Sequence, residues 1–281
     1  MHYGFIITAG DPRTAADLAH EAEAAGWDGV FTWDGIAIGD MPSYDPWVTM
    51  AAMAMRTERV RLGAILTPPS RRRPWKLARE TMTLDHLSNG RLIVPVGLGA
   101  LDDAGFGAVG ETTDRATRAA LLDESLDILE GLWSGQPFAY AGKHYAFPEL
   151  TFLPPTVQQP RIPIWVTAAW PYPKSMARAL RYDGILPNAA GPNGQMGEAS
   201  VEQIGEIVAY VREHRPATTP FAIVAQGVTP AADPAAAAAQ VQPWRDAGAT
   251  WWIEADWTGD TSAAALRRRI AAGPPDGGGS G

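Results

Sequence analysis

The sequence contains no cysteine. Disulfide bonds, thiolate metal sites and a cysteine nucleophile are therefore excluded. Histidine is also scarce, and no two histidines have the two- or four-residue spacing that is typical of a metal site. The five are His2, His20, His86, His144 and His214. We therefore predict no bound metal, and a metal-dependent barrel hydrolase is strongly disfavoured.

The sequence also lacks a long apolar run and a basic patch. No stretch of about 18 apolar residues is free of charge, so we predict no membrane span and no membrane partner. The first residues run directly into a predicted strand without the charged and apolar regions of a signal peptide. The net charge is −8 and the basic residues are scattered, which argues against nucleic-acid binding. We expect a cytoplasmic protein.

What the sequence does contain is a regular alternation of short β-like runs with helical periods, the pattern of repeated βα units. A chain of 281 residues that is 46% hydrophobic suits one eight-stranded parallel α/β barrel of the TIM type, which typically needs about 250 residues. The predicted strands are Gly4–Thr8, Gly29–Trp33, Val60–Leu66, Leu92–Leu98, Ile162–Ala168, Gly184–Asn188, Phe221–Gln226 and Thr250–Glu254.

Three helices are predicted to begin at an Asp-Pro pair, because aspartate caps a helix and proline suits its first turn. These pairs start at Asp11, Asp45 and Asp233, and Ser200 with Gln203 forms a capping box before another helix. We assign residues 1–272 to a single barrel domain. Residues 134–161 are an insertion before strand five, with a hairpin predicted over or beside the barrel mouth. The glycine- and proline-rich tail at 273–281 is predicted to be disordered.

The residues that follow each strand predict the lining of the site, because they meet at one end of a parallel barrel. This set is aromatic and small, with few paired charges, and suits a flat apolar ligand. It comprises Trp33-Asp34-Gly35, Leu66-Thr67, Gly97-Leu98-Gly99, Ala168-Ala169-Trp170, Asn188, Gln226 and Glu254 to Trp257. Trp33, Trp170, Trp252 and Trp257 are the tryptophans that we expect to stack on a ring.

Two loops could bind an anion. The glycines of Gly97-Leu98-Gly99 allow close backbone approach to a phosphate, or form only a tight turn. The arginines at 71–73 precede a helix and could hold an anion, or they lie in a solvated loop with one salt bridge to Glu80 or Asp85. Asp34 and Glu254 are the carboxylates best placed for acid–base catalysis, with helix-end or arginine pairing as the alternative.

Motifs in order along nearly the whole chain resemble the luciferase-like monooxygenase family. They are Asp45-Pro46-Trp47, residues 57–63 with Thr67-Pro68, residues 71–80 and 83–91, Gly97-Leu98-Gly99, Leu122-Asp123-Glu124, residues 132–135, residues 163–166 and residues 183–187. The resemblance implies a barrel that binds FMN or a 5-deazaflavin (F420), with the phosphate held by loops after strands four and five. It also implies a non-prolyl cis peptide at Ala64–Ile65, in a bulge that supports the flavin. The cofactor-binding candidates are therefore Ala64, Ile65, Thr67, Gly97, Leu98, Gly99, Ala168, Ala169 and Trp170.

The chain departs from the family pattern at three positions. Gly35 stands where many relatives have a histidine near the reactive ring, Leu98 where bacterial luciferase has a phosphate-binding arginine, and Pro95 where glycine is common. Proline at 95 is tolerable only if its missing N–H is not needed in the sheet.

The preferred interpretation is a flavin-dependent monooxygenase that uses reduced FMN and oxygen on a small organic substrate. The alternatives are hydride transfer with a deazaflavin, which the arginine loop favours, and a flavin-binding barrel without turnover, which Gly35 favours. The resemblance implies a homodimer as the oligomeric state and a separate flavin reductase as a partner.

Overall fold

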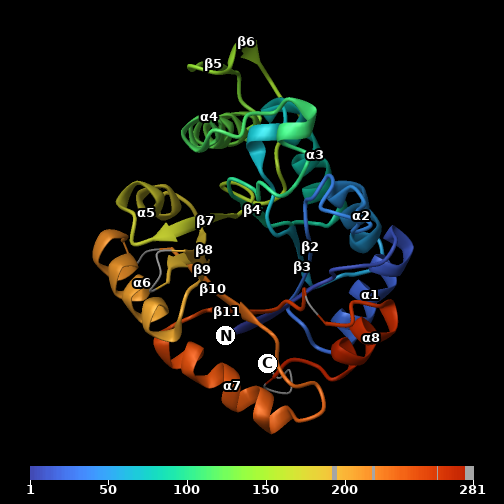
Figure 1. The fold of residues 1–281 in the computed structure, drawn as a ribbon. Helices are drawn as coiled ribbons and strands as arrows, with labels where there is room; N and C mark the ends of the chain where they lie inside the picture. The colour runs from blue at the N-terminus through green and yellow to red at the C-terminus, as the bar shows by residue number, and fades with distance from the viewer. Residues whose placement is uncertain (192–194, 217–218, 258, 276–281) are drawn as a thin grey trace.

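A computed structural model describes residues 1–191, 195–216, 219–257 and 259–275, and its strands form a barrel ringed by helices (Figure 1). All eight predicted strands are present and parallel, which confirms the eight-stranded α/β barrel. They are β1 (His2–Ile6), β2 (Gly29–Thr32), β3 (Arg61–Ala64), β4 (Val94–Val96), β7 (Ile164–Trp170), β8 (Gly184–Ala190), β10 (Ala222–Gly227) and β11 (Trp251–Glu254). The helices are α1 (Pro12–Ala24), α2 (Pro46–Ala54), α3 (Pro74–Leu87), α4 (Arg115–Trp133), α5 (Pro173–Leu180), α6 (Val201–His214), α7 (Pro234–Ala247) and α8 (Ala263–Ala271).

The strand order is β3-β2-β1-β11-β10-β8-β7-β4, so the first and last strands of the chain are neighbours. Two short bridges, Leu62 to Leu92 and Thr67 to Val96, bring β3 to β4 and close the barrel. A short strand β9 (Met196–Glu198) pairs antiparallel with the end of β8. No helix in these described ranges combines the length and apolar character needed to cross a bilayer.

The apolar side chains form two clusters because strand residues alternate between the two faces of the barrel wall. The inner cluster fills the barrel and contains Ile6, Phe31, Ile93, Trp165, Leu186, Val224, Trp251, Ile253 and Ala255. The larger cluster combines the outward strand residues with helix residues such as Leu18, Met50, Leu77 and Leu126. A strand-end residue therefore faces either the barrel opening or the helix layer.

The end of β3 is irregular. Between the two bridges β3 advances from 62 to 67 while β4 advances only from 92 to 96, so β3 carries an extra residue, a bulge. The carbonyl of Pro95 accepts from Thr67 N at 2.9 Å, but Pro95 has no N–H to donate to β3, and β3 and β4 are joined only by these two bridges. Just beyond the end of β3 at Ala64, the peptide bond between Ile65 and Leu66 is cis, so the predicted position Ala64–Ile65 was wrong by one residue.

The helix starts agree with the sequence. Asp11, Asp45 and Asp233 each accept hydrogen bonds from main-chain N–H groups of the following turn. Ser200 and Gln203 form both halves of the capping box. Local capping chemistry therefore sets where these helices begin. Of the predicted disordered tail, residues 276–281 lie outside the described residues.

The predicted hairpin consists of β5 (Phe138–Ala141) and β6 (Ala146–Leu150), paired antiparallel. Glu124 of α4 accepts hydrogen bonds from the main-chain N–H groups of the turn at 2.9–3.0 Å. Trp75 of α3 packs edge-on against Tyr145 and Phe147. The hairpin thus covers the outer side of α3 and α4, and Figure 1 shows it at the periphery of the molecule, whereas the sequence predicted it over or beside the opening.

Candidate functional site

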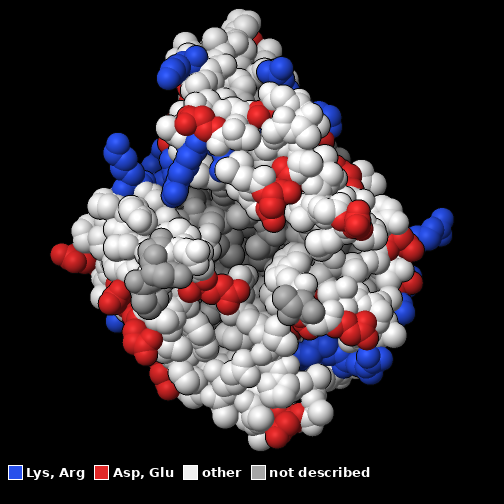
Figure 2. Space-filling view, viewed as in Figure 1, with Lys and Arg blue, Asp and Glu red and all other residues white. Residues whose placement is uncertain are grey.

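The carboxyl ends of the strands surround an opening, and Figure 2 shows this face of the molecule hollowed at its centre. Two hollows lie there, and Ile65, Leu66 and Gln226 belong to the walls of both. The Thr167 hollow has a volume of about 100 Å³ and is also lined by Thr167, Leu186, Pro187, Asn188, Glu198, Ala199, Ile204, Val224, Ala225 and Trp244. The Trp33 hollow has a volume of about 330 Å³ and is also lined by Trp33, Asp34, Ile38, Met41, Pro68, Arg71, Gly99, Ala100, Asp103 and Trp257.

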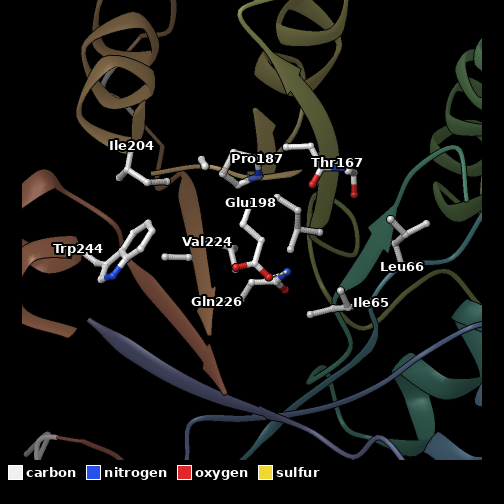
Figure 3. Close-up of a pocket in the computed structure, with 13 residues that line it drawn as sticks. Ile65, Leu66, Thr167, Pro187, Glu198, Ile204, Val224, Gln226 and Trp244 are labelled. Atoms are coloured by element: carbon white, nitrogen blue, oxygen red, sulfur yellow. Dashed lines mark hydrogen bonds between the residues drawn. The ribbon is translucent and has the colours of Figure 1, made fainter. Parts of the chain in front are cut away.

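The Thr167 hollow is bordered by two polar side chains that meet. Figure 3 shows Glu198 and Gln226 pointing toward one another, with a hydrogen bond of 3.0 Å from Gln226 Nε2 to Glu198 Oε1. Ile65 and Leu66 stand on one side of this pair in the view, and Trp244 stands on the other. The rest of the wall is mostly apolar, apart from the polar side chains of Thr167 and Asn188.

The glycine loop after β4 lies against the bulge. A Cβ atom at Gly97 would lie 2.9 Å from Leu66 Cδ2 and 3.0 Å from Thr167 Cβ. Gly99 has a φ of +79°, and a Cβ there would lie 2.8 Å from the Phe106 ring. The loop conformation therefore requires glycine at 99, and side chains larger than hydrogen would fill the space beside Leu66.

Arg118 of α4 holds this loop by its carbonyl groups. Its Nη1 donates to the carbonyls of Leu98 at 3.0 Å and Gly99 at 3.3 Å. The N–H groups of Leu98, Gly99 and Ala100 donate to no other described residue. Since Gly99 is left-handed, such successive free amides form the kind of concavity that binds an anion.

Three buried polar atoms near this loop have no hydrogen-bond partner among the described residues: Thr67 Oγ1, Thr167 Oγ1 and Arg118 Nε. Arg118 is 4% exposed and forms no ion pair in the described part of the chain. Buried donors and a buried charge are normally satisfied, so these groups indicate a polar, anionic ligand beside the loop. A phosphate-bearing flavin fits this set.

The arginine loop is neither a free anion site nor a solvated loop, so both predicted alternatives were wrong for Arg71 and Arg72. Arg72 donates to Asp34 through Nε at 2.9 Å and Nη2 at 2.8 Å. Arg71 donates to Asp34 Oδ1 at 3.2 Å and also to Asp103. Arg73 lies outside the cluster, with its guanidinium 6.0 Å from the Trp75 ring.

Asp103 ties together the loops that follow β2 and β4. It accepts from the main-chain N–H groups of Ile36, Ala37 and Gly105 at 2.8–3.0 Å. Burial opposes its charge, but these amides and the Arg71 guanidinium together lower the pKa of Asp103 to about 2. Burial acts to lower the pKa of Arg72, but the charge and hydrogen bonds of Asp34, together with the charges of Glu80 and Asp45, raise this pKa overall. The four charged groups form one buried network beside the Trp33 hollow.

The two predicted acid–base residues, Asp34 and Glu254, both form buried ion pairs with arginines. Asp34 borders the Trp33 hollow, but its side chain is fully buried beneath the two arginines. Glu254 points to the helix layer, where it accepts from Thr229 N at 2.7 Å and from Arg269 at 3.0 Å. The expectation that Glu254 reaches the barrel mouth was wrong, because Trp251 and Ile253 face inward and the alternation turns residue 254 outward.

Most of the remaining predicted residues fall into two groups, those at the hollows and those in the outer apolar cluster, because strand side chains alternate between the two faces of the barrel wall. Ile65 and Gly99 line the hollows, and Gly97 closes against them. The side chains of Ala64, Leu98, Ala168 and Trp170 belong to the outer apolar cluster, and Trp252 lies there beside Trp244. Trp170 donates to Glu206 at 2.9 Å, so it and Trp252 are not available to stack on a ring at the mouth. Ala169 is buried, with its N–H donating to Ser175 Oγ at 2.9 Å, and lines neither hollow.

Strand alternation should have identified Thr167, which the sequence prediction missed. Trp165 faces inward, so the residue two positions later faces the same way. Leu66 and Gln226 stand in both walls, although only their strand-end positions were noted from the sequence. The absence of a side chain at Gly35 also has a structural reason, because a Cβ there would lie 2.2 Å from the Trp33 ring.

Comparison with known proteins agrees with this fold. The chain is 30% identical to an F420-dependent glucose-6-phosphate dehydrogenase from Nakamurella multipartita, over 69% of this chain and 58% of that protein. It is 30% identical to the oxygenase component of a flavin-dependent trigonelline monooxygenase from Acinetobacter baylyi, over 55% of this chain and 42% of that protein. The chain thus spans only about half the length of these two relatives.

A monooxygenase from Streptomyces bottropensis has the same fold, with a TM-score of 0.78 and 20% identity over 96% of both chains. The model of the family described as luciferase-like monooxygenase matches residues 3–278. The chain therefore belongs to the luciferase-like monooxygenase family.

Proposed function

We propose that the protein is a flavin-dependent oxidoreductase that binds reduced FMN and uses oxygen to oxidise a small organic substrate. The observation that carries the proposal is the combination at the barrel mouth of free amides and unpartnered buried donors with two apolar hollows. FMN has a matching pair of parts: its anionic phosphate suits the free amides and donors, and its flat ring suits the apolar hollows. A hollow of about 330 Å³ is within the range of small-molecule sites.

Different residues of the site would hold the phosphate and the ring of the cofactor. The amides of Leu98, Gly99 and Ala100 would hold the phosphate, and the positive charge of Arg118 behind the loop would compensate its negative charge. The ring would lie on Ile65 and Leu66, which border both hollows. Bound reduced flavin would supply the electrons of the reaction.

The walls of the Trp33 hollow would exclude water from the reacting groups. Trp33 and Trp257 meet edge-on at 6.2 Å, and Ile38 and Met41 complete an apolar side. Excluding water strengthens the hydrogen bonds made inside and protects reactive species. Asp103 holds the loop that carries Ile38 in place, through the amides of Ile36 and Ala37.

The second candidate is hydride transfer with a deazaflavin, which the relative named as an F420-dependent dehydrogenase favours. The arginine loop no longer supports it, because Arg71 and Arg72 are occupied by Asp34 and Asp103. The third candidate, a flavin-binding barrel without turnover, rested on Gly35. That glycine is explained by the position of the Trp33 ring.

One experiment separates the three candidates. The purified chain is titrated anaerobically with FMN and with F420, each reduced beforehand, and the absorbance spectrum is followed before and after a pulse of oxygen. We expect tighter binding of reduced FMN and a change in its rate of oxidation by oxygen. Tighter binding of F420 would favour hydride transfer, and binding without any effect on oxidation would favour the binding protein.

The proposal also includes a partner protein and an oligomeric state. One relative is named as an oxygenase component, so we propose that a separate reductase supplies the reduced flavin. We also propose that the chain forms a homodimer, which sedimentation at several concentrations would test.

Replacing Gly99 with valine is expected to weaken FMN binding at least tenfold without unfolding the barrel. The new side chain would meet Phe106 and Pro68 and displace the amides from the phosphate position. Gly110→Val is the matched control, because Gly110 has a similar φ of +81° but open space around it. Fluorescence titration of both variants tests this, and equal affinities in two folded variants would remove the loop from the cofactor site.

A further inference from the structure

The polar pair at the Thr167 hollow, Glu198 and Gln226, is placed there by the sheet. Val224 belongs to the inner apolar cluster, so Gln226, two residues further along β10, faces the same way. Glu198 lies opposite Asn188 in the antiparallel pair of β9 with β8. Gln226 is half-buried and borders both hollows, whereas Glu198 is exposed and borders only the Thr167 hollow. The side chain of Gln226 is therefore part of the wall that the two hollows share.

The contact with Glu198 fixes which way the amide of Gln226 faces. A side-chain amide has one atom that donates, Nε2, and one that only accepts, Oε1, whereas an ionised carboxylate only accepts. Nε2 must therefore be the atom that meets Glu198, and it donates to Glu198 Oε1 at 3.0 Å. The reverse orientation would bring two acceptors together. Glu198 thus determines that Oε1 of Gln226 is presented away from the carboxylate of β9.

Oε1 of Gln226 is an acceptor that a ligand can reach. It accepts from no residue in the described part of the chain, and, unlike Thr167 Oγ1, it is not a fully buried atom. In Figure 3 the amide lies between Glu198 and Ile65, and Ile65 borders both hollows. Because Nε2 donates to a charged group, the amide is polarised, which makes Oε1 a stronger acceptor. The shared wall therefore presents one strong acceptor beside an apolar surface.

A ligand group that donates an N–H suits this position. A flavin ring carries N3–H in both redox states and gains N5–H on reduction. Its carbonyl oxygens are acceptors and would be repelled by Oε1. Ile65 and Leu66, on which the ring would lie, border the same hollows as Gln226. Gln226 would therefore favour an N–H edge of the ring over a carbonyl edge.

We propose that Glu198 is a positioning residue, which fixes the amide of Gln226 so that Oε1 accepts a hydrogen bond from a ring N–H of the bound flavin. Gln226 contacts the ring, and Glu198 acts only through Gln226. The inference deepens the proposed function and rests on it, because it takes the ring to lie on Ile65 and Leu66. Together the two residues determine which edge of the ring faces β10.

The test measures the affinity for three reduced flavins by anaerobic isothermal titration calorimetry. The probes are FMN, N3-methyl-FMN, which lacks N3–H, and 5-deaza-FMN, whose reduced form has no N5–H. The variants are Gln226→Met, which has similar length but no amide, Glu198→Ala, and the double variant. Gln240→Met is the matched control, because Gln240 donates to the carbonyl of Val228 at 2.8 Å and lines neither hollow.

We expect Gln226→Met to weaken binding of reduced FMN about threefold to tenfold, the usual size of a neutral hydrogen bond, and Gln240→Met to leave it unchanged. Glu198→Ala should weaken binding about twofold or more, because the amide is then less polarised and can present either end. That weakening should disappear in the Gln226→Met background, since residues that act as a unit are not additive. One of the two altered flavins should bind the unaltered chain more weakly than FMN, and Gln226→Met should abolish the difference. That flavin identifies the ring nitrogen.

Unchanged affinity for reduced FMN in folded Gln226→Met would overturn the inference. An equal effect of Gln226→Met on all three flavins would do the same, and so would a loss with Glu198→Ala that persists in the double variant. The three flavins on the unaltered chain form a test of their own, which does not depend on the folding of any variant. Equal affinities for all three would also overturn the inference.

The outcomes separate this inference from the proposed function once the same samples receive the pulse of oxygen. Flavin binding that depends on Gln226, without any effect of the protein on flavin oxidation, would leave the inference standing and end the proposed monooxygenase. An altered rate of oxidation with flavin affinity indifferent to Gln226 would do the reverse. Failure of the unaltered chain to bind FMN would end both.

Discussion

Replacing Asp34 with asparagine is expected to lower the free energy of unfolding by about 3–5 kcal/mol. The side chain is fully buried and accepts three hydrogen bonds from Arg71 and Arg72. Asparagine keeps the shape, but it removes the charge that compensates two buried guanidinium groups, and its amide cannot accept the same bonds. Chemical denaturation monitored by tryptophan fluorescence measures the change.

The control for Asp34 is Asp17→Asn. Asp17 pairs with Arg56 at 3.1 Å, but both side chains are half-exposed, so a loss below about 1 kcal/mol is expected. The rival hypothesis is that Asp34 assists catalysis as an acid or base. It would be supported if Asp34→Asn kept its stability and lost turnover by roughly 10²–10⁴ at unchanged flavin affinity.

Replacing Glu254 with glutamine is expected to cost about 3 kcal/mol of stability and to leave kcat and KM unchanged. The carboxylate is 2% exposed and lies between β11 and α8, where it accepts from Thr229, Trp252 and Arg269. Without its charge, Arg269 loses its partner in the helix layer. The site at the barrel mouth is not touched, because neither hollow is lined by Glu254.

The matched control for Glu254 is Glu21→Gln, which breaks another ion pair of α8. Glu21 meets Arg267 at 2.9 Å, and both side chains are well exposed, so we expect little change in stability. Thermal unfolding and steady-state kinetics on both variants decide the matter. A large fall in kcat for Glu254→Gln at normal melting temperature would return Glu254 to the list of catalytic candidates.

The sequence predicted the strands and helix starts well because both depend on neighbours in the chain. Alternating and continuous apolar runs marked all eight strands, and aspartate before proline marked three helix starts. The ends of β3 and β4 were less accurate. The pairing of β3 with β4 is reduced to two bridges beside Pro95, and the bulge shortens β3. Both effects arise from the pairing of two strands about 30 residues apart.

The site was predicted only in outline. Residues after each strand were correctly expected to gather at one end of the barrel, and Ile65 and Gly99 do line the hollows there. Individual lining residues were predicted wrongly where the alternation of side chains between the two faces of a strand was not followed. Ala168 was chosen, but its side chain faces the helix layer, and Thr167 faces the hollow. The hairpin itself was predicted correctly, but its position was not. It packs on the outer surface of α3 and α4, through the contact of Trp75 with Tyr145 and the hydrogen bond from Lys143 N to Glu124.

By itself, the sequence determined the eight βα units, the helix caps, the glycine loop after β4 and the family. These follow from periodicity and from short motifs, which act over a few residues. Only the tertiary structure decided that Asp34 is bound by arginines about 38 residues later and that Glu254 faces Arg269. Charged side chains are long and choose partners from any element that barrel closure brings near. That choice is made by proximity in space and burial, which spacing along the chain does not encode.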